Sequence, residues 1–133
     1  MIGIVLVGHS EIAPAMRCGI EHVLGPQPQL ATLAVAGSMR AEAIEAELRV
    51  QLATVEEGSG ALIMADMLGG TPCNVAASLC SPGRIELVCG LNLPMAIKAV
   101  KLRSVMDDPA LLAATVVEAG RSYIRHLEPQ SHD

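Results

Sequence analysis

The sequence is almost free of aromatic side chains. Its 133 residues include no Trp, no Phe and a single Tyr, and the formal net charge is −5 at pH 7. Aromatic rings are the platforms on which single-stranded nucleic acids stack their bases, and clustered Lys and Arg residues attract phosphate backbones and anionic membranes. Because the sequence offers neither feature, we expect no nucleic acid and no anionic membrane surface among its partners.

Long apolar runs are also missing, although hydrophobic residues make up 51% of the sequence. None approaches the ~18 residues that a membrane-spanning helix needs. The first residues lack the basic region of a signal peptide, so we expect a cytoplasmic protein without direct membrane insertion. The length fits a single domain, which we place at residues 1–127, followed by a polar, frayed tail over residues 128–133.

No two cysteines have the close spacing of a metal-binding motif. The four cysteines are Cys18, Cys73, Cys80 and Cys89. Without a close-spaced pair of ligands a metal site has little support, and we expect neither a metal nor another cofactor. In a cytoplasmic chain, the free thiol is the expected state of all four cysteines.

Short apolar runs separated by helix-like segments predict an α/β fold. The runs cover residues 2–7, 30–35, 61–65 and, more weakly, 85–89. Nearly continuous hydrophobicity is typical of parallel strands that helices cover on both faces. Apolar spacing and the positions of Gly and Pro predict helices over residues 12–24, 39–55, 72–79, 93–102 and 109–120.

This alternation predicts an open, mostly parallel four-stranded sheet in the order 2-1-3-4, with helices on both faces. Residues 122–127 either extend the last helix or add a short strand at the edge of the sheet.

Polar residues stand at the ends of the first and third predicted strands. His9 closes the first strand region and Asp66 directly follows the third. Ligands of open α/β sheets bind outside the carboxyl ends of the strands, and the order 2-1-3-4 makes these two strands neighbours. Asp66 can then accept a hydrogen bond from Nδ1–H of His9, which leaves Nε2 with a free lone pair as a nucleophile or base.

A glycine turn after Asp66 adds a candidate anion site. Gly69 and Gly70 permit a tight turn with exposed amides, and we place Thr71 at the N-cap and Pro72 at the first position of the next helix. A glycine turn that leads into a helix N-terminus binds anions, phosphate foremost. A nucleophile beside such a cradle predicts transient phosphorylation of His9.

Four residues that follow the third and fourth predicted strands, at the same edge of the sheet as His9 and Asp66, are candidates for partner docking: Met67, Leu68, Asn92 and Pro94. The remaining histidines are expected to be solvated and uninvolved: His22, His126 and His132.

These motifs resemble the EIIA domain of the mannose family of bacterial phosphoenolpyruvate:sugar phosphotransferase systems. The resemblance rests on Gly8-His9, on Asp66 with residues 69–74, and on residues 90–95, and it extends to about residue 125. It implies that His9 accepts a phosphoryl group on Nε2 from phospho-HPr and passes it to an EIIB component. Asp66 would orient His9, and Thr71 with the neighbouring amides would hold the phosphoryl oxygens. The resemblance also implies a homodimer that needs no metal, and in some members the C-terminal strand exchanges between subunits.

The sequence departs from that family at three positions. Leu68 and Cys73 stand where the family often has aromatic residues, and Ser10 stands where it often has Gly. These departures leave the phosphoryl site intact and change the surface that partners would contact. Because few residues follow the predicted fold, we expect no attached EIIB domain. The chain then serves either a transporter with a separate EIIB component or a regulatory role as a stand-alone phosphoacceptor that reports carbon supply.

Two other function classes fit less well. A receiver-type module phosphorylated on Asp66 needs an acidic pair at the end of the first strand and a Lys at a later strand end, but the first strand ends in Gly8-His9. A hydrolase would need Ser10 or Cys73 as nucleophile. Ser10 is adjacent to His9 in sequence, which is poor geometry for a triad, and Cys73 lies inside a predicted helix.

Overall fold

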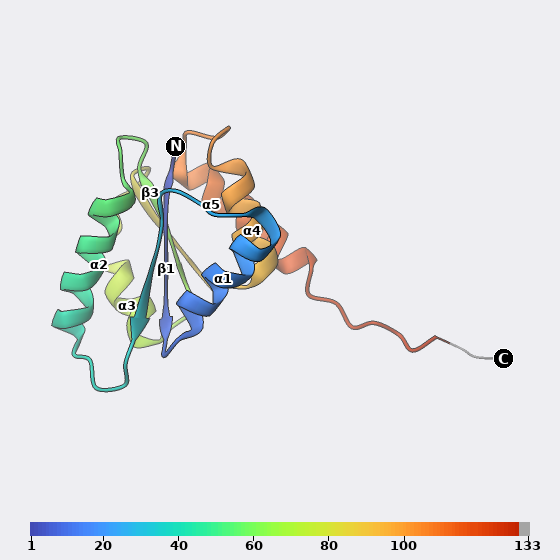
Figure 1. Cartoon of the computed structure of the whole chain (residues 1–133), viewed down its shortest axis with the longest axis horizontal. Coiled ribbons are helices and arrows are strands. Elements are labelled where there is room, and N and C mark those ends of the chain that lie inside the picture. The colour runs from blue at the N-terminus through green and yellow to red at the C-terminus, as the bar shows by residue number, and fades with distance from the viewer. Residues whose placement is uncertain (131–133) are drawn as a thin grey trace.

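Four parallel strands form the centre of the molecule, which the computed structural model describes over residues 1–130 (Figure 1). The strands are β1 (Gly3–His9), β2 (Leu30–Val35), β3 (Ala61–Ala65) and β4 (Ile85–Cys89). They pair in the order β2-β1-β3-β4, and all three pairings are parallel. The predicted strand order is therefore confirmed, and all pairs of neighbouring strands are parallel.

Five helices cover the two faces of this sheet. They are α1 (Ile12–Leu24), α2 (Ala41–Val55), α3 (Thr71–Ala77), α4 (Leu93–Leu102) and α5 (Pro109–Ser122). Helices α2 and α3 lie on one face, and α1, α4 and α5 lie on the other (Figure 1). None of the helices in residues 1–130 is both long enough and apolar enough to cross a membrane.

Strand β1 shows why the apolar runs are continuous. Side chains alternate between the two faces of a strand. Val5 and Val7 therefore enter the core under α2 and α3, while Ile4 and Leu6 enter the core under α1, α4 and α5. All four side chains are fully buried, so neither face of the strand tolerates a polar residue until the strand reaches its end at His9.

The observed boundaries differ from the predicted ones at a few ends. Strand β1 continues beyond its apolar run to His9, because its pairing with β2 extends to the partners His9 and Val35. Helix α2 begins at Ala41 rather than at residue 39. Helix α3 begins and ends earlier than predicted, at Thr71 and Ala77.

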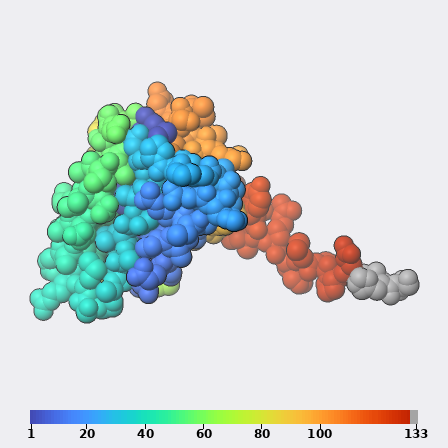
Figure 2. All heavy atoms as spheres, in the orientation of Figure 1, coloured from blue at the N-terminus to red at the C-terminus, as the bar shows by residue number. Residues whose placement is uncertain are grey.

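The segment after α5 leaves the body of the molecule as an extended chain (Figure 1, Figure 2). Of the two predicted alternatives, helix extension holds as far as Ser122, and residues 123–130 form neither helix nor strand. An edge strand does not form because this segment lies away from the sheet. Residues 131–133, and with them His132 and the end of the predicted tail, lie outside the described residues.

A buried arginine fastens the amino-end side of the sheet. Arg103 is 1% exposed, and its guanidinium donates hydrogen bonds to the carbonyls of Gln29 and Pro28 and to Oε1 of Gln27. Burial lowers the pKa of this guanidinium from its ordinary value. The bonds tie the end of α4 to the loop that enters β2, so the amino ends of the strands are held together opposite the predicted site.

Candidate functional site

His9 and Asp66 meet at the carboxyl ends of two neighbouring strands. The register pairs Val7 of β1 with Ala65 of β3, and the amide of Asp66 donates to the carbonyl of Val7 at 3.2 Å. Oδ2 of Asp66 lies 2.9 Å from the backbone nitrogen of His9 and also 2.9 Å from its Nδ1. One carboxylate oxygen therefore holds both the main chain and the ring of the histidine, as the predicted juxtaposition requires.

The environment of Asp66 keeps its carboxyl group ionised. Its side chain is only 10% exposed, and this burial by itself raises the pKa. Hydrogen bonds from the backbone and ring of His9, the positive charge of that ring when it is protonated, and the nearby Met67 amide outweigh burial and lower the pKa of Asp66 below its ordinary value. Because a carboxylate only accepts hydrogen bonds, we assign the proton of the neutral imidazole to Nδ1, and Nε2 keeps its lone pair.

Small and strained backbone positions make room for this pair. A side chain at Gly8 would place its Cβ 3.1 Å from Cγ of Asp66, so the carboxylate reaches His9 across a residue without a side chain. Directly after His9, Ser10 adopts a left-handed backbone conformation with φ of +53°. The chain thereby turns away at once, and the His9 side chain stays 45% exposed.

The first turn of α3 forms the wall beside the free ring nitrogen. A Cβ at Gly70 would stand 2.9 Å from Cε1 of His9 and 3.5 Å from Nε2. Gly70, not Thr71, is the N-cap of α3, so the predicted cap position of Thr71 is wrong. The extended backbone of Gly70 (φ −71°, ψ 162°) takes the cap position without a side-chain hydrogen bond, and the helix starts one residue earlier.

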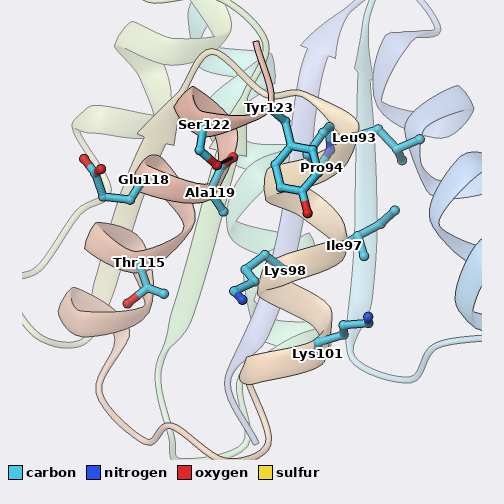
Figure 3. A pocket seen from close by; sticks show the side chains of 10 residues that line it. All are labelled: Leu93, Pro94, Ile97, Lys98, Lys101, Thr115, Glu118, Ala119, Ser122 and Tyr123. Carbon is cyan, nitrogen blue, oxygen red and sulfur yellow. Dashed lines mark hydrogen bonds between the residues drawn. The ribbon is translucent and has the colours of Figure 1, made fainter. Parts of the chain in front are cut away.

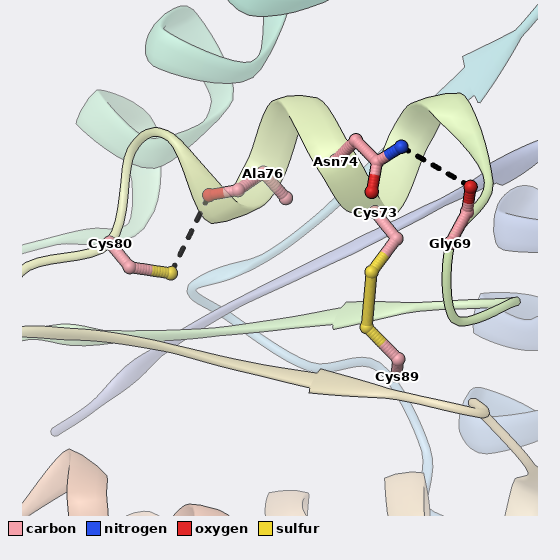
Figure 4. Close-up of a disulfide and its surroundings, with 6 residues drawn as sticks. All are labelled: Gly69, Cys73, Asn74, Ala76, Cys80 and Cys89. Atoms are coloured by element: carbon pink, nitrogen blue, oxygen red, sulfur yellow. Dashed lines mark hydrogen bonds between the residues drawn. A yellow bond between two sulfur atoms is a disulfide. The ribbon is translucent and has the colours of Figure 1, made fainter.

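This correction leaves the Thr71 hydroxyl available to a ligand. Thr71 is the first residue of α3, is exposed, and has no side-chain hydrogen bond to any part of residues 1–130. The preceding turn is fixed by Asn74, whose Nδ2 donates to the carbonyl of Gly69 at 3.2 Å (Figure 4). The unpaired amides that begin any helix, the free hydroxyl and the adjacent imidazole together suit a small anion at Nε2.

The four predicted docking residues have different surroundings. Met67 and Leu68 are 55% and 80% exposed and follow Asp66 directly. Asn92 uses both side-chain atoms within the fold: Oδ1 accepts from the amide of Met95, and Nδ2 donates to the carbonyl of Gly120. Pro94 lines a groove of about 650 Å³ between α4 and α5 (Figure 3). A docking role stays a prediction for all four.

The other histidines lie outside the site, and no metal-binding cluster accompanies them in the described part of the chain. His126 is exposed, as predicted, and His22 on α1 is exposed as well. Within residues 1–130, no group of three or more His, Cys, Asp or Glu side chains is arranged to hold a metal ion.

The prediction of four free thiols is wrong for two of them. Cys73 and Cys89 are joined in a disulfide, whereas Cys18 and Cys80 are free and exposed (Figure 4). The bond forms because α3 packs back over the sheet and sets its first turn against the end of β4, a contact that sequence spacing does not reveal.

Comparisons with known proteins agree on one family. The family model described as "PTS system fructose IIA component" (EIIA-man) matches residues 3–116. The chain is 29% identical over 130 residues to the "PTS system mannose-specific EIIAB component" of Escherichia coli, covering 96% of this chain and 40% of that protein. The chain thus spans less than half the length of that relative. It is also 25% identical over 104 residues to the "PTS system fructose-specific EIIA component" of Bacillus subtilis, covering 77% of this chain and 71% of that one.

The chain is also similar to solved structures of phosphotransferase system components. A phosphotransferase system component EIIA from Streptococcus agalactiae superposes with a TM-score of 0.86 at 25% identity, over 95% of this chain and 97% of that one. The mannose/sorbose specific IIA subunit from Enterococcus faecalis superposes with a TM-score of 0.85 at 26% identity, over 99% and 98%.

Substitution of Gly70 tests whether its backbone lies directly beside the ring of His9. The backbone of Gly70 accepts alanine, but the new Cβ would collide with the His9 ring, so Gly70→Ala should displace the ring and weaken its bond to Asp66. The imidazole ¹⁵N chemical shifts of His9 report this change. Gly69→Ala is the matched control: its φ of +83° costs about 1 kcal/mol of unfolding free energy, but open space surrounds its Cβ. Unchanged His9 signals in Gly70→Ala would contradict this geometry.

The lowered pKa of Asp66 predicts an acid-dependent contribution to stability. A carboxyl whose pKa is lower in the folded than in the unfolded chain stabilises the fold above its unfolded pKa, and this contribution disappears as pH falls through its folded pKa. The difference in unfolding free energy between wild type and Asp66→Asn should therefore be largest near neutrality and shrink below about pH 4. Urea titrations across this range measure it. Asp107→Asn controls for the loss of one exposed charge, and a gap that widens in acid would refute the assignment.

Proposed function

Because the chain belongs to the EIIA-man family of the sugar phosphotransferase system, we propose that His9 is its phosphoacceptor. In this proposal, Nε2 of His9 takes a phosphoryl group from phospho-HPr and passes it to an EIIB component. The observation that carries the proposal is that Oδ2 of Asp66 accepts hydrogen bonds from both the backbone amide and Nδ1 of His9. With the ring proton on Nδ1, Nε2 is the unprotonated nitrogen of a side chain that is 45% exposed. We further propose that the protein works in the cytoplasm.

Each transfer exchanges one phosphorus–nitrogen bond for another. The lone pair of Nε2 attacks the phosphorus atom of the donor's phosphohistidine, the donor's P–N bond breaks, and its electron pair returns to the donor nitrogen. The imidazole then carries more positive charge, and the Asp66 carboxylate at 2.9 Å from Nδ1 stabilises that charge. Transfer to the acceptor runs through the same steps with the roles exchanged.

The first turn of α3 would meet the negative charge of the phosphoryl oxygens. Phosphoryl transfer is catalysed mainly by positioning and by fixed donors at the developing charge. Gly69 and Thr71 supply main-chain amides, the Gly70 amide also donates to the carbonyl of Met67 at 3.3 Å, and the Thr71 hydroxyl adds a side-chain donor. These groups leave no catalytic step that requires a metal. Exposed Met67 and Leu68 next to the site suit apolar docking of the donor and the acceptor, and Asn92 and Pro94 follow the carboxyl end of β4, the strand next to β3.

The chemical stability of the label tests which residue carries it. After incubation with phosphoenolpyruvate, enzyme I and HPr, wild type should take up one phosphoryl group, even with EDTA present. His9→Ala should take up none, while His22→Ala, which alters an exposed histidine outside the site, should behave as wild type. A phosphoramidate on His9 is lost in mild acid and survives alkali, whereas an acyl phosphate on Asp66 is lost in alkali as well. Label on His9→Ala, or label stripped by alkali, would overturn the proposal.

We also propose that the protein is a homodimer. Strand β4 is an edge of the sheet, and Tyr123, Ile124 and Leu127 on the segment after α5 are 70%, 74% and 82% exposed. An unpaired strand edge and exposed apolar side chains are features that a second subunit covers.

Light scattering at micromolar concentration tests the dimer. Wild type should give the mass of two chains, and the triple variant Tyr123→Ser, Ile124→Ser, Leu127→Ser should shift toward one. Val105→Ser is the control, since it removes an apolar side chain that is 77% exposed on the loop after α4. A monomeric wild type, or a triple variant that stays dimeric, would count against this surface.

A further inference from the structure

The candidate phosphoryl site is tied covalently to the neighbouring strand. Cys73 is the third residue of α3 and Cys89 is the last residue of β4, and their disulfide joins Cα atoms that are 6.7 Å apart (Figure 4). Cys73 is 4% exposed, while Cys89 is partly exposed. The bridge therefore crosses the core between α3 and the sheet, with one of its sulfur atoms nearer to solvent.

Both ends of the bridge lie next to components of the site. Cys73 stands three residues after Gly70, whose α-carbon forms the wall beside His9 Cε1 and Nε2. Cys89 is the register partner of Ala65, the residue directly before Asp66. Breaking or forming the disulfide can therefore shift the anion cradle, which we define as Gly69, Gly70 and Thr71, through the first turn of α3. It can also shift the Asp66 carboxylate through the pairing of Cys89 with Ala65.

Apart from the disulfide, the first turn of α3 is held by noncovalent contacts alone: Pro72 is buried, and the hydrogen bonds at the turn are short-range. The helix has seven residues and no side-chain hydrogen bond at its N-cap. The turn before it contains two glycines, and its described hydrogen bonds run from Asn74 Nδ2 to the carbonyl of Gly69, from Asn74 N–H to the carbonyl of Gly70 and from Gly70 N–H to the carbonyl of Met67, at 3.2, 2.9 and 3.3 Å. The covalent bond at Cys73 is therefore the strongest constraint on the position of the cradle.

We propose that Cys73 and Cys89 form a redox-sensitive pair that sets the rate at which His9 accepts a phosphoryl group, with the disulfide form the faster. The inference rests on the proposed function of His9. Donors that are fixed before the reaction stabilise developing charge without reorganisation, and small misplacements of such groups reduce rates steeply. The disulfide supplies this fixation, and its reduction lets the first turn of α3 move relative to Nε2.

The switch is a thiol–disulfide exchange with a small-molecule disulfide. The thiolate of the more accessible Cys89 attacks one sulfur of that disulfide, forms a mixed disulfide and releases one small thiol. The thiolate of Cys73 then attacks the Cys89 sulfur and releases the second small thiol. Two protein thiols are oxidised, one small disulfide is reduced to two thiols, and the protons of the protein thiols end on the released thiols. An excess of small thiol reverses both steps.

A regulatory role fits the location of the bond better than a purely structural one. Two separate hydrophobic cores already cover the sheet, and a domain of this size folds without covalent staples. Disulfides of cytoplasmic proteins are typically transient and redox-sensing. The other two cysteines, Cys18 and Cys80, are free and exposed, so they provide internal controls for nonspecific oxidation.

The test compares the two redox states of the whole chain. One sample is oxidised with glutathione disulfide, a second is reduced with dithiothreitol, and both are desalted before assay so that enzyme I and HPr meet no reagent. Peptide mapping without reductant should find Cys73 linked to Cys89 in the first sample only. Phosphorylation of His9 should be about threefold to tenfold slower in the reduced sample, and reoxidation should restore the rate. Amide and imidazole NMR signals of Gly69, Gly70, Thr71 and His9 should differ between the states.

Matched variants separate the pair from general effects of oxidation. Cys73→Ser and Cys89→Ser should each react at the slower rate under both conditions, whereas the double variant Cys18→Ser, Cys80→Ser should keep the full redox response. Failure of the linked peptide to form, or equal rates in both states of wild type, would overturn the proposal. If no sample takes up a phosphoryl group, the proposed function fails instead. NMR signals that are identical in linked and reduced chains would then reject the coupling independently.

Discussion

A single carboxylate oxygen, Oδ2 of Asp66, accepts hydrogen bonds from both the backbone amide and the ring Nδ1 of His9. These two residues are 57 positions apart, and only a parallel pairing of β1 with β3 brings their strand ends together. The chain must therefore complete a crossover through α1, β2 and α2 and return to the other side of β1 before the site exists. Sheet order is in this sense a condition of the chemistry, and the glycine at position 8 is a condition of the contact, because any Cβ there would approach the carboxylate.

The two cores explain why the strand ends hold their positions. Each strand of the sheet's centre is buried on both faces, so a shift of β1 against β3 would disturb packing on both sides at once. Arg103 adds a fixed point at the opposite end, where its guanidinium holds the loop before β2 by three hydrogen bonds. The His9 side chain thus extends from a strand that is packed on both faces.

Sequence reasoning succeeded where one local signal decides the outcome. Continuous apolar runs predict parallel strands, and polar residues directly after two neighbouring strands predict the contact between His9 and Asp66 that the structure contains. Predictions from sequence failed for features that depend on how elements pack against one another in three dimensions. The cap of α3 moved from Thr71 to Gly70 because an extended glycine backbone fills that position without a side chain. Arg103 carries no sequence sign of burial, since its partners are carbonyls 74 to 76 residues away. The partner of Cys73 depends on how α3 lies over β4, which spacing alone does not determine.

The departures at Leu68 and Cys73 act on different parts of this arrangement. Leu68 is 80% exposed, so exchanging an aromatic ring for leucine there alters what a partner meets without touching Nε2. Cys73 is 4% exposed and lies in the core between α3 and the sheet, so an aromatic residue expected there from the resemblance would fill more of that space than a cysteine does. The covalent bond to Cys89 constrains the same position in another way. Packing against a ring holds a helix under all redox conditions, whereas a disulfide holds it only while oxidised. In our proposal, a disulfide at this position makes the placement of Gly69, Gly70 and Thr71 dependent on thiol chemistry.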